Sequence, residues 1–397
     1  MSTKNLIVAF GGVSPEHEVS VLSAIQAISS MEQSSYNLVP LYITKSGKWL
    51  SGDALLNLEN YKDLNALEKQ AFNCAFVKDE IGRTHLKQQD ATGMFSKPKS
   101  FPVYAVLCAF HGSGGENGSF QGICDFYNVP YTGSDVLASS LGMNKVKAKQ
   151  LCVANEIPVT DSLDFYESNW ETDQDTILKE AEMIGYPLIV KPCSLGSSIG
   201  VAKADSKEEL IDAVEIAFRY DAHVLVEEAI HPLMEINCSV LGTPENCRAS
   251  VCEKPLGSSE TLSFQDKYQS GEGADKGMAS ADRVIPADIS AKLTEEIREL
   301  AIRTFKTFGT SGVARLDFLL NADTEKVYFN EINTIPGSFS FYLWEKSDLS
   351  FTQLIEELIA IALKNHQQKN GRVQSYETNL LNEKAAKGIK GLKGIKN

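Results

Sequence analysis

Four polar residues near the ends of two adjacent predicted strands carry the strongest chemical signal in the sequence. They lie in ARLDFLLNADTEKVYFNEINTIPG, residues 314–337, where Asp317 ends one strand and Glu331 and Asn333 lie near the end of the next. Alternate residues of a strand share a face, so paired strands would bring two carboxylates and one amide together. Such oxygen ligands suit Mg²⁺ that bridges nucleotide phosphates, and Arg315, on the face of Asp317, could hold a phosphoryl oxygen. The alternative is a solvated strand face.

A Gly/Ser loop directly after a strand is the second candidate. Lys191 closes the apolar run PLIVK, and the loop GSSIG at 196–200 follows it with Ser197 and Ser198. Small side chains, hydroxyls and backbone N–H groups let such a loop close over phosphates. The spacing differs from a Walker A motif, because the lysine precedes the loop. Gly/Ser turns are common, so the lysine at the strand end gives the motif most of its weight.

Two further loops place polar side chains at strand ends. Glu16 stands between Gly11-Gly12 and a predicted helix, where the helix dipole favours a carboxylate, so a simple cap is the alternative to a ligand role. His111 opens HGSGGENGS, a Gly-rich loop after an apolar strand, which is the usual ligand edge of an open α/β sheet. Neither segment decides the function alone.

Some charged residues acquire weight only from their context. Lys145 lies in a helix predicted over 137–154, where a solvated lysine is the ordinary expectation. Glu227 and Glu228 end a predicted strand on opposite faces, so at most one of them is expected to point inward.

The polar segment at 256–282 is predicted to be a long loop. Loops of this length without their own structure are usually functional or disordered. Lys267 and Tyr268 lie within it, so they are candidates for a lid.

The pattern of apolar runs predicts the elements that position these residues. A strand at 5–10, the Gly pair, a helix and a strand at 37–43 are the opening of a parallel α/β sheet. The region 51–100, with one hairpin, is predicted to decorate this sheet. The other expected strands are 101–110, 187–191, 223–228, 235–241, 247–254, 313–320 and 326–332, and the expected helices include 207–219, 290–308 and 349–365.

The length of the chain, 397 residues, exceeds what a single core usually supports. We therefore expect an N-terminal α/β domain at 1–134, a small central domain at 135–222 and a C-terminal domain at 223–370. Residues 371–397 end in KAAKGIKGLKGIKN, with lysine at every third position. Such a basic, low-complexity tail is expected to be disordered.

Composition argues against several classes of partner. The net charge is −14, which repels nucleic acid and anionic membrane surfaces, and no apolar stretch is long enough to span a bilayer. The opening MSTKNLIVAFGG has too short an apolar run for a signal peptide. None of the eight cysteines forms a C-x-x-C pair, so reduced thiols and a cytoplasmic location are expected.

Taken in order, six segments resemble the D-alanine–D-alanine ligases of the ATP-grasp superfamily. They are GGVSPEHEVS, HGSGGENGSFQG, YTGSDVLASSLGMNK, PLIVKPCSLGSSIG, DKY, and GVARLDF with NEINTIPG. The resemblance implies an ATP-grasp fold of mixed α/β and α+β class with an N-terminal Rossmann-like parallel sheet. It implies ligation of two D-alanines through an acyl-phosphate for peptidoglycan precursor synthesis. ATP as substrate, two Mg²⁺ that Mn²⁺ can replace, and a homodimer are implied as well.

The resemblance also assigns roles to individual residues. ATP would be bound by Lys145, Lys191, Ser198, Glu227, Ala229, Ile230, Glu235 and Lys267. Mg²⁺ would be held by Asp317, Glu331 and Asn333. Catalysis would use Glu16, Ser197, Tyr268, Arg315 and the N–H of Gly337. The amino-acid substrates would meet Glu16, His111, Tyr342 and Leu343.

One departure from the family pattern leaves the acceptor open. After NTIPG the chain reads SFSFYLWEKSD, where relatives more often have a Thr-Ser stretch that contacts the second substrate. Tyr342 and Leu343 fall at the equivalent offset, and packing against the 349–365 helix is an alternative role for these aromatic residues. The acceptor could therefore be D-serine or D-lactate. A third hypothesis, an ATP-binding protein without catalysis, conflicts with the complete set of metal ligands, Arg315 and both lysines.

Overall fold

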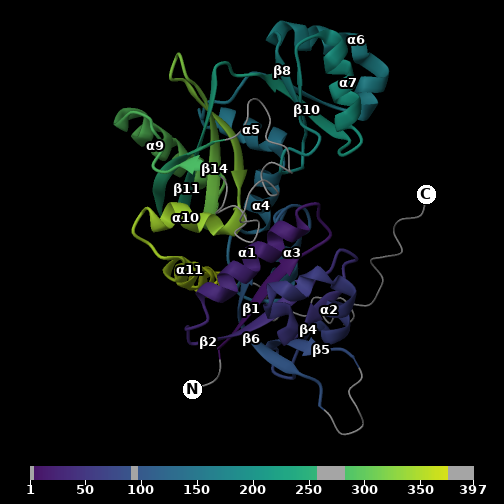
Figure 1. Cartoon of the computed structure of the whole chain (residues 1–397), viewed down its shortest axis with the longest axis vertical. Helices are drawn as coiled ribbons and strands as arrows, with labels where there is room; N and C mark the ends of the chain where they lie inside the picture. The colour runs from purple at the N-terminus through teal and green to yellow at the C-terminus, as the bar shows by residue number, and fades with distance from the viewer. Residues whose placement is uncertain (1–3, 91–96, 257–281, 374–397) are drawn as a thin grey trace, which may run out of the picture.

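Strands of the described residues form three sheets stacked along the long axis of the molecule (Figure 1). The computed structural model describes residues 4–90, 97–256 and 282–373. The N-terminal sheet lies at one end, the five-stranded sheet lies in the middle, and a smaller sheet with two helices lies at the other end. Most of the predicted basic tail at 371–397 and almost all of the predicted loop at 256–282 lie outside the described residues.

The N-terminal sheet has a parallel centre. Strand β1 (Lys4–Gly11) lies between β2 (Tyr36–Ile43) and β6 (Ser100–Cys108) and is parallel to both, which confirms the predicted opening. The antiparallel strands β3 (Trp49–Ser51), β4 (Phe72–Lys78) and β5 (Thr84–Gln88) then close the sheet into a ring. The predicted hairpin is β4–β5, and it completes the sheet rather than decorating it, because β5 pairs with β6.

Short helices cover this sheet and connect its strands. Helix α1 (His17–Ser30) follows β1 directly and packs on it. The connections after β3 and β6 carry η1 (Asp53–Leu56), η2 (Leu58–Lys62), α2 (Leu64–Gln70) and α3 (Ser119–Tyr127).

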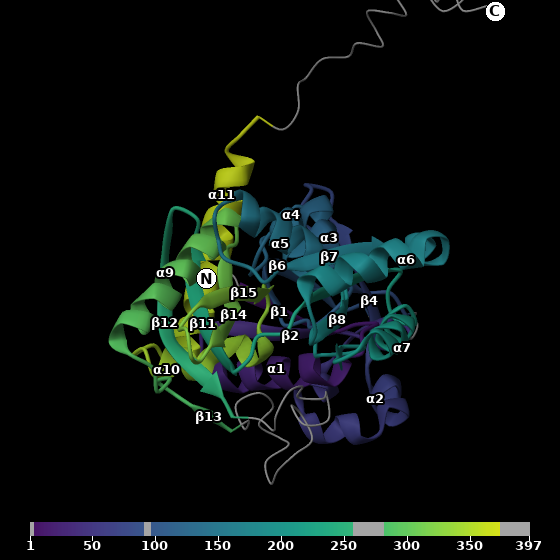
Figure 2. The ribbon, with the colours of Figure 1, turned by 90° about the horizontal axis from the view of Figure 1, so that it is seen from above.

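The central sheet has the strand order β7-β10-β8-β9. Its bounds are β7 (Ser162–Tyr166), β8 (Leu188–Pro192), β9 (Ala202–Ala204) and β10 (His223–Glu228), and helices α6 (Glu167–Ile184) and α7 (Lys207–Ala217) cover it (Figure 2). Strand β10, which we expected to open the C-terminal domain, belongs to this sheet. The reason is that Val224 and Val226 are buried in the core beneath α6 and α7.

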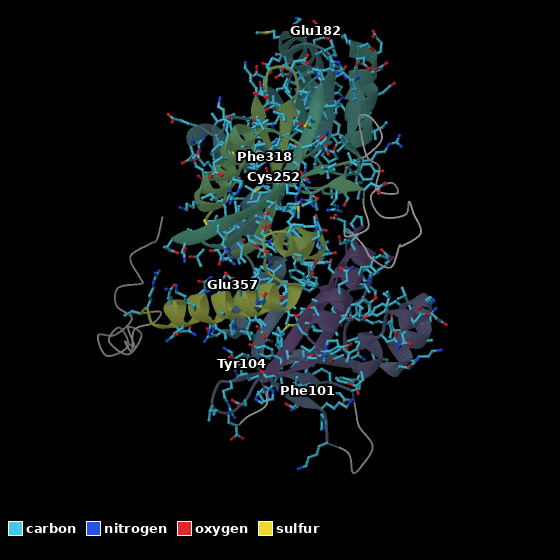
Figure 3. The ribbon with its side chains drawn as sticks, turned by 60° about the vertical axis from the view of Figure 1, so that its left-hand side comes forward. Phe101, Tyr104, Glu182, Cys252, Phe318 and Glu357 are labelled. Carbon is cyan, nitrogen blue, oxygen red and sulfur yellow. The ribbon has the colours of Figure 1, made fainter. Side chains whose placement is uncertain are left out.

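The third sheet is antiparallel, in the order β13-β12-β11-β14-β15. Its strands are β11 (Leu233–Thr243), β12 (Asn246–Pro255), β13 (Arg283–Val284), β14 (Gly312–Asn321) and β15 (Val327–Asn333). Helix α9 (Ala291–Thr307) buries Ile297, Ala301 and Phe305 against one face, in a core that includes Cys252 and Phe318 (Figure 3). The other face is left for the polar residues described below.

The helix predicted over 137–154 is interrupted. It consists of α4 (Val136–Met143) and α5 (Lys145–Ala154), separated by Asn144 at φ −91° and ψ 103°. The Asn144 side chain accepts a hydrogen bond of 2.8 Å from the Lys147 N–H, an N-cap that sequence periodicity does not reveal. Lys145 is therefore the first residue of a helix, and its N–H donates to Cys193 O at 2.9 Å.

The last described helices return to the N-terminal sheet. After η4 (Gly337–Ser340) and α10 (Phe341–Glu345), helix α11 (Phe351–Asn370) buries Leu354 and Leu358 in the same core as Leu6 and Val8 of β1. The C-terminal segment thus fixes the position of the N-terminal domain relative to the five-stranded sheet. Within the described ranges, no helix is both long and apolar enough to cross a membrane.

Gly11→Ala tests the turn that places α1 after β1. Gly11 has φ +89°, and a Cβ there would lie 2.2 Å from the Ile43 carbonyl oxygen. We expect a loss of at least about 3 kcal/mol in the free energy of unfolding, measured by urea denaturation. Gly82→Ala is the control, because Gly82 has φ +81° but open space around it, so it carries only the backbone cost of about 1–2 kcal/mol. Equal losses in the two variants would contradict this account.

Candidate active site

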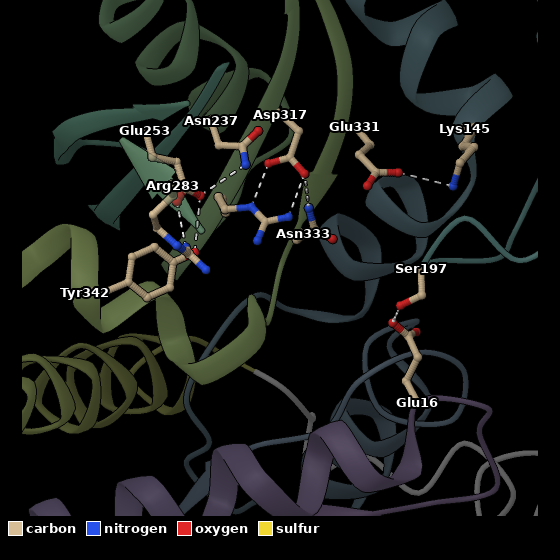
Figure 4. A network of polar contacts seen from close by, with 11 residues as sticks. Glu16, Lys145, Ser197, Asn237, Glu253, Arg283, Asp317, Glu331, Asn333 and Tyr342 are labelled. Carbon is tan, nitrogen blue, oxygen red and sulfur yellow. Dashed lines mark hydrogen bonds and ion pairs between the residues drawn. The ribbon is translucent and has the colours of Figure 1, made fainter. Parts of the chain in front are cut away.

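A row of polar side chains crosses the five-stranded sheet on the face opposite α9. Asn237 of β11 pairs with Glu253 of β12 on one side and with Asp317 of β14 on the other, and Asp317 pairs with Glu331 of β15. Directly opposed residues of adjacent strands share a face, so these four side chains lie side by side (Figure 4). We call this set, Glu253, Asn237, Asp317 and Glu331, the polar row.

Asp317, in the polar row, is held by two neighbouring side chains. Arg315 binds it through two hydrogen bonds of 2.7 Å, from Nε and Nη2, and the Asn333 amide donates to it at 3.1 Å. Burial raises the pKa of Asp317, and the guanidinium group opposes that rise. The predicted convergence of Arg315, Asp317 and Asn333 on one face is therefore present in the structure.

Lys145 joins the polar row to the Gly/Ser loop. Its Nζ lies 3.4 Å from Glu331 Oε2 and donates to the Leu195 carbonyl oxygen at 2.6 Å. Because Lys145 begins α5, the break at Asn144 aims this side chain at the site. The described part of the chain contains no group of three or more His, Cys, Asp and Glu side chains that could hold a metal. The predicted metal ligands are the carboxylates of Asp317 and Glu331 and the amide of Asn333. In this structure Arg315 pairs with Asp317, and Lys145 lies beside Glu331.

A second buried ionic cluster lies where β8 meets β10. Glu227, 1% exposed, contacts both Lys191 and Lys149, the latter at 2.7 Å, and accepts a hydrogen bond from Thr160 at 2.9 Å. Burial alone would raise the pKa of Glu227, but the two lysines hold it well below its ordinary range. Lys191 also donates to Asn330 Oδ1 at 2.9 Å, which connects the central sheet to β15.

The remaining nucleotide candidates lie around this cluster. Burial would lower the pKa of Lys191, but Glu227, Glu331 and the exposed Glu235 together raise it, so Glu235 lies within electrostatic reach of that lysine. Ala229 donates its N–H to Pro187 O at 3.1 Å, and the Ile230 side chain is buried. Lys267 and Tyr268 lie outside the described residues, and their roles stay predictions.

Glu16 connects the N-terminal domain to the Gly/Ser loop. Ser197 Oγ donates a hydrogen bond to Glu16 Oε1, although the two residues lie in segments that follow strands of different sheets, β8 and β1 (Figure 4). A Cβ at Gly196 would lie 3.0 Å from Glu16 Oε2, so glycine permits the close approach. Ser197 and Ser198 have φ +53° and +57°, a region that residues other than glycine rarely adopt. The Gly/Ser loop therefore has a strained backbone, and it contacts the Glu16 carboxylate.

His111 links the Gly-rich loop to the turn that carries Gly337. Its Nε2 lies 2.8 Å from Ser23 Oγ, which accepts a hydrogen bond of 2.9 Å from the Ser338 N–H. Burial lowers the pKa of His111 to about 4, and the charge of Arg315 adds to this effect, so the ring is neutral at physiological pH. Nearby, burial and the charge of Glu16 raise the pKa of Glu116 to about 8.

The turn after Gly337 is held in an unusual conformation. Ser338, Phe339 and Ser340 are buried and have φ of +52°, +55° and +50°. In α10, Phe341 stacks on Phe351 of α11 at 4.5 Å, as the packing alternative predicted for this stretch. Tyr342 instead points to the polar row, where its hydroxyl donates to Glu253 Oε1 at 3.2 Å, and the Leu343 side chain is fully buried.

The order of these elements matches a known protein family over most of the chain. The model described as "D-ala D-ala ligase N-terminus" covers residues 5–134, and the one described as "D-ala D-ala ligase C-terminus" covers residues 151–360. The chain belongs to the D-alanine–D-alanine ligase family. It has the ATP-grasp fold with mixed α/β and α+β sheets that the resemblance implied.

Relatives in the D-alanine–D-alanine ligase family align along nearly the whole length. A D-alanine–D-alanine ligase of Thermosipho melanesiensis is 37% identical over 96% of this chain and 99% of its own. One of Thermosipho africanus is 39% identical over 96% of this chain and 100% of its own.

Solved structures agree with these relatives. The D-alanine–D-alanine ligase of Coxiella burnetii superposes with a TM-score of 0.77 at 27% identity, covering 94% of this chain and 97% of that one. The VanG D-Ala:D-Ser ligase of Enterococcus faecalis superposes with a TM-score of 0.75 at 30% identity, covering 91% and 100%.

The sequence analysis missed several members of the site. Lys149 lies four residues after Lys145 on the same helix, and that spacing could have indicated a shared face. Four others have no local signal, because only contacts between distant segments bring them to the site. They are Thr160, which binds Glu227, Asn237 and Glu253 of the polar row, and Arg283, which forms an ion pair with Glu253.

Glu227→Gln tests the buried ionic cluster. The change leaves two buried lysines without a counter-charge, so we expect a loss of about 3–5 kcal/mol in the free energy of unfolding at pH 7. The pKa of folded Glu227 lies well below its ordinary value of 4.5. Its contribution to stability is therefore complete above that pH and decreases steadily as the pH falls from 4.5 toward the lower pKa of the folded state. Urea denaturation from pH 7 to 3 should therefore show the two proteins converging in acid.

Glu228→Gln is the matched control for this prediction. Glu228 is the next residue of β10 and is only partly buried, so its loss should cost less than about 1 kcal/mol at every pH. A constant gap between the wild type and Glu227→Gln down to pH 3 would contradict the assignment.

Ser340 allows a test of the left-handed turn. Its hydroxyl has no hydrogen-bond partner among the described residues, and both Ser340→Gly and Ser340→Ala remove it. Only glycine adopts a positive φ without a steric cost. We therefore expect the free energy of unfolding of the glycine variant to be about 1 kcal/mol higher than that of the alanine variant. An alanine variant at least as stable as the glycine variant would contradict this strain.

Proposed function

We propose that this member of the D-alanine–D-alanine ligase family joins two D-alanines at the expense of ATP, through an acyl-phosphate, and so supplies a precursor of peptidoglycan. The observation that carries the proposal is the polar row, where Arg315, Asp317, Glu331 and Asn333 meet Lys145. These are the residues that a carboxylate-activating ligase needs at one place.

Activation of the first substrate requires compensation of negative charge. A carboxylate is a poor electrophile, because its oxygen would leave as oxide, whereas an acyl-phosphate has a good leaving group. Lys145 and Lys191 would contact the phosphates and offset the repulsion between the triphosphate and the carboxylate. Both lysines already lie on the face where the central sheet meets β15.

The oxygen ligands of the polar row fit Mg²⁺. Asp317 and Glu331 are opposed on adjacent strands, and Asn333 touches Asp317, so two carboxylates and one amide converge. We propose that they hold two Mg²⁺, replaceable by Mn²⁺, which when bound neutralise phosphate charge. Arg315 would then turn from Asp317 toward the oxyanion of the tetrahedral intermediate, together with the Gly337 N–H.

The donor amino acid would lie between the N-terminal domain and the Gly/Ser loop. Glu16 would bind its ammonium group, and the neutral His111 would lie near its carboxylate. Ser197 and Ser198 would close the loop over the site and exclude water, which would otherwise hydrolyse the acyl-phosphate. The contact between Ser197 and Glu16 supports this closure, because it spans the two domains.

The nucleoside would bind beside β10. We propose that Glu235 contacts the ribose and that the backbone at Ala229 and Ile230 lies near the adenine. The resemblance assigns Glu227 to ATP binding. Because Glu227 is buried between two lysines, we propose that it contributes by positioning Lys191.

Helix α10 would supply the residues that contact the second (acceptor) substrate. Tyr342 and Leu343 would line the second substrate site, through the Tyr342 ring and the Leu343 backbone, since the Leu343 side chain is fully buried. We favour D-alanine as acceptor over D-serine, because the Thermosipho relatives described above are D-alanine–D-alanine ligases at 37% and 39% identity. The 30% identity with a D-Ala:D-Ser ligase keeps D-serine as the second candidate.

Three wider properties are also proposals. They are a division into units at 1–134, 135–222 and 223–370 with β10 joined to the central unit, a homodimer, and a cytoplasmic location. Analytical ultracentrifugation would test the dimer directly.

The test of the proposed function is phosphate release with ATP and Mg²⁺, with products identified by mass. D-alanine alone should give phosphate and D-alanyl-D-alanine in equal amounts. Phosphate release only when D-serine or D-lactate is added would show that one of these, and not D-alanine, is the acceptor. No release with any of these substrates would favour an ATP-binding protein without catalysis.

Glu331→Gln tests the metal assignment. The variant keeps the shape of the side chain but removes one carboxylate, so kcat for dipeptide formation should fall more than about a hundredfold with the fold intact. Glu296→Gln, on the exposed face of α9, should leave kcat unchanged. Full turnover of Glu331→Gln would overturn the assignment.

A further inference from the structure

The end of the polar row farthest from Lys145 carries a buried cluster in which only Tyr342 has a role so far. Arg283 of β13 forms an ion pair of 2.6 Å with Glu253, and these side chains are 9% and 1% exposed. Asn237 donates to Glu253 Oε1 at 3.1 Å, and Tyr342 donates to the same oxygen at 3.2 Å. We call Arg283, Glu253, Asn237 and Tyr342 the tyrosine clamp (Figure 4).

The clamp uses both the ring and the hydroxyl of Tyr342. The guanidinium carbon of Arg283 lies 3.9 Å from the ring centroid, a stacking distance for a cation on an aromatic face. Burial raises the pKa of the Tyr342 phenol, and the charge of Arg283 acts against that rise. A phenol has a single proton, and here that proton goes to Glu253. Tyr342 is therefore fixed on one face and has no donor left for a bound molecule.

The position of the clamp places it on the acceptor side of the reaction. Lys145 and the proposed phosphate groups lie at the β15 end of the polar row, and the clamp lies at the β12 end. Arg315, the proposed oxyanion partner, lies on β14 between them. Asp317 raises its pKa most, and Tyr342 and Glu253 raise it further, so Arg315 lies within electrostatic reach of the clamp. The amine and the departing phosphate occupy different positions on the tetrahedral carbon, so the acceptor would arrive from the end away from the phosphates.

We propose that Glu253 and Arg283 are positioning residues that hold Tyr342 as a rigid wall of the acceptor site, and that this wall selects D-alanine over D-serine. The inference rests on the proposed ligase function and adds the basis of acceptor choice. The physical reason is that the hydroxyl of D-serine would lose water at this wall without gaining a hydrogen bond from Tyr342. The methyl group of D-alanine loses nothing there.

A competition experiment with the full-length enzyme measures this choice. The enzyme receives ATP, Mg²⁺ and equal concentrations of D-alanine and D-serine, and mass spectrometry gives the ratio of D-alanyl-D-alanine to D-alanyl-D-serine at low conversion. We expect the wild type to favour D-alanine by about ten- to a hundredfold, the range for rejecting an added hydroxyl by shape and desolvation. Glu253→Gln should lower that ratio about tenfold, because a neutral amide holds both Arg283 and the phenol more weakly than the carboxylate does. It should also raise KM for the acceptor while KM for ATP stays constant.

A double variant tests whether Glu253→Gln changes the product ratio through the Tyr342 hydroxyl. Adding Tyr342→Phe to Glu253→Gln removes the released hydroxyl and should restore the preference for D-alanine. Persistence of the lowered ratio in the double variant would overturn the role of Tyr342. Arg283→Lys keeps the charge but loses the planar stack, so it should shift the ratio in the same direction and serves if Glu253→Gln does not fold.

A similar arrangement around Trp344, which lies on α10 with Tyr342, offers a matched control. Arg248 lies 5.5 Å from the ring of Trp344 and forms two hydrogen bonds of 2.7 Å with Glu357, so an arginine, a glutamate and an aromatic ring meet there as well. Glu357→Gln should leave the product ratio unchanged. A ratio in Glu253→Gln equal to that of the wild type and of this control would show that the clamp only stabilises the fold.

The failure of this inference is separable from failure of the proposed function. A wild-type enzyme that makes chiefly D-alanyl-D-serine would overturn the inference and leave ATP-dependent ligation intact. A wild-type enzyme that makes neither dipeptide would overturn the proposed function itself.

Discussion

Charge compensation along the polar row determines how the elements around the site are placed. The antiparallel register sets three carboxylates, Glu253, Asp317 and Glu331, and one amide across four strands, and the carboxylates are largely shielded from water. A buried carboxylate without a partner would be strongly destabilising, and here Arg283, Arg315 and Lys145 supply the cations. Each cation comes from a different element, so the charges also fix how β13, β14 and α5 are placed.

The loops that reach this row meet by close backbone approach. Glycine at 112 and 196 leaves room for the Glu16 carboxylate, and a Cβ at either position would come within 3.0 Å of it. The Ser338–Ser340 turn reaches Ser23 of α1 only through consecutive left-handed residues. The site therefore joins all three sheets, although most of its chemistry stands on one.

Local patterns predicted much of this architecture, and pairing between distant segments accounts for the rest. The βαβ opening, the strands around Asp317 and Glu331 and the Gly/Ser loop followed from periodicity and turn residues. The same reasoning joined α4 and α5, since the cap at Asn144 interrupts no hydrophobic pattern. The expected boundary between residues 222 and 223 also separates β10 from the central sheet in which it lies, because the sequence of a strand does not specify which strands it pairs with. Glu253 and Arg283 join the site through strand pairing and the ion pair between them, so neither could be found from its own surroundings.

We propose that Arg315 and Lys145 neutralise Asp317 and Glu331 until nucleotide phosphates bring metal to them. Electron paramagnetic resonance of free Mn²⁺, titrated into the protein with and without ADP, tests it most directly. With both carboxylates held by cations and no cluster of three His, Cys, Asp or Glu side chains in the described residues, Mn²⁺ alone should bind weakly. With ADP present, binding should tighten at least about tenfold, and Asp317→Asn should abolish that gain. Equally tight binding without nucleotide, or an undiminished gain in Asp317→Asn, would contradict the account.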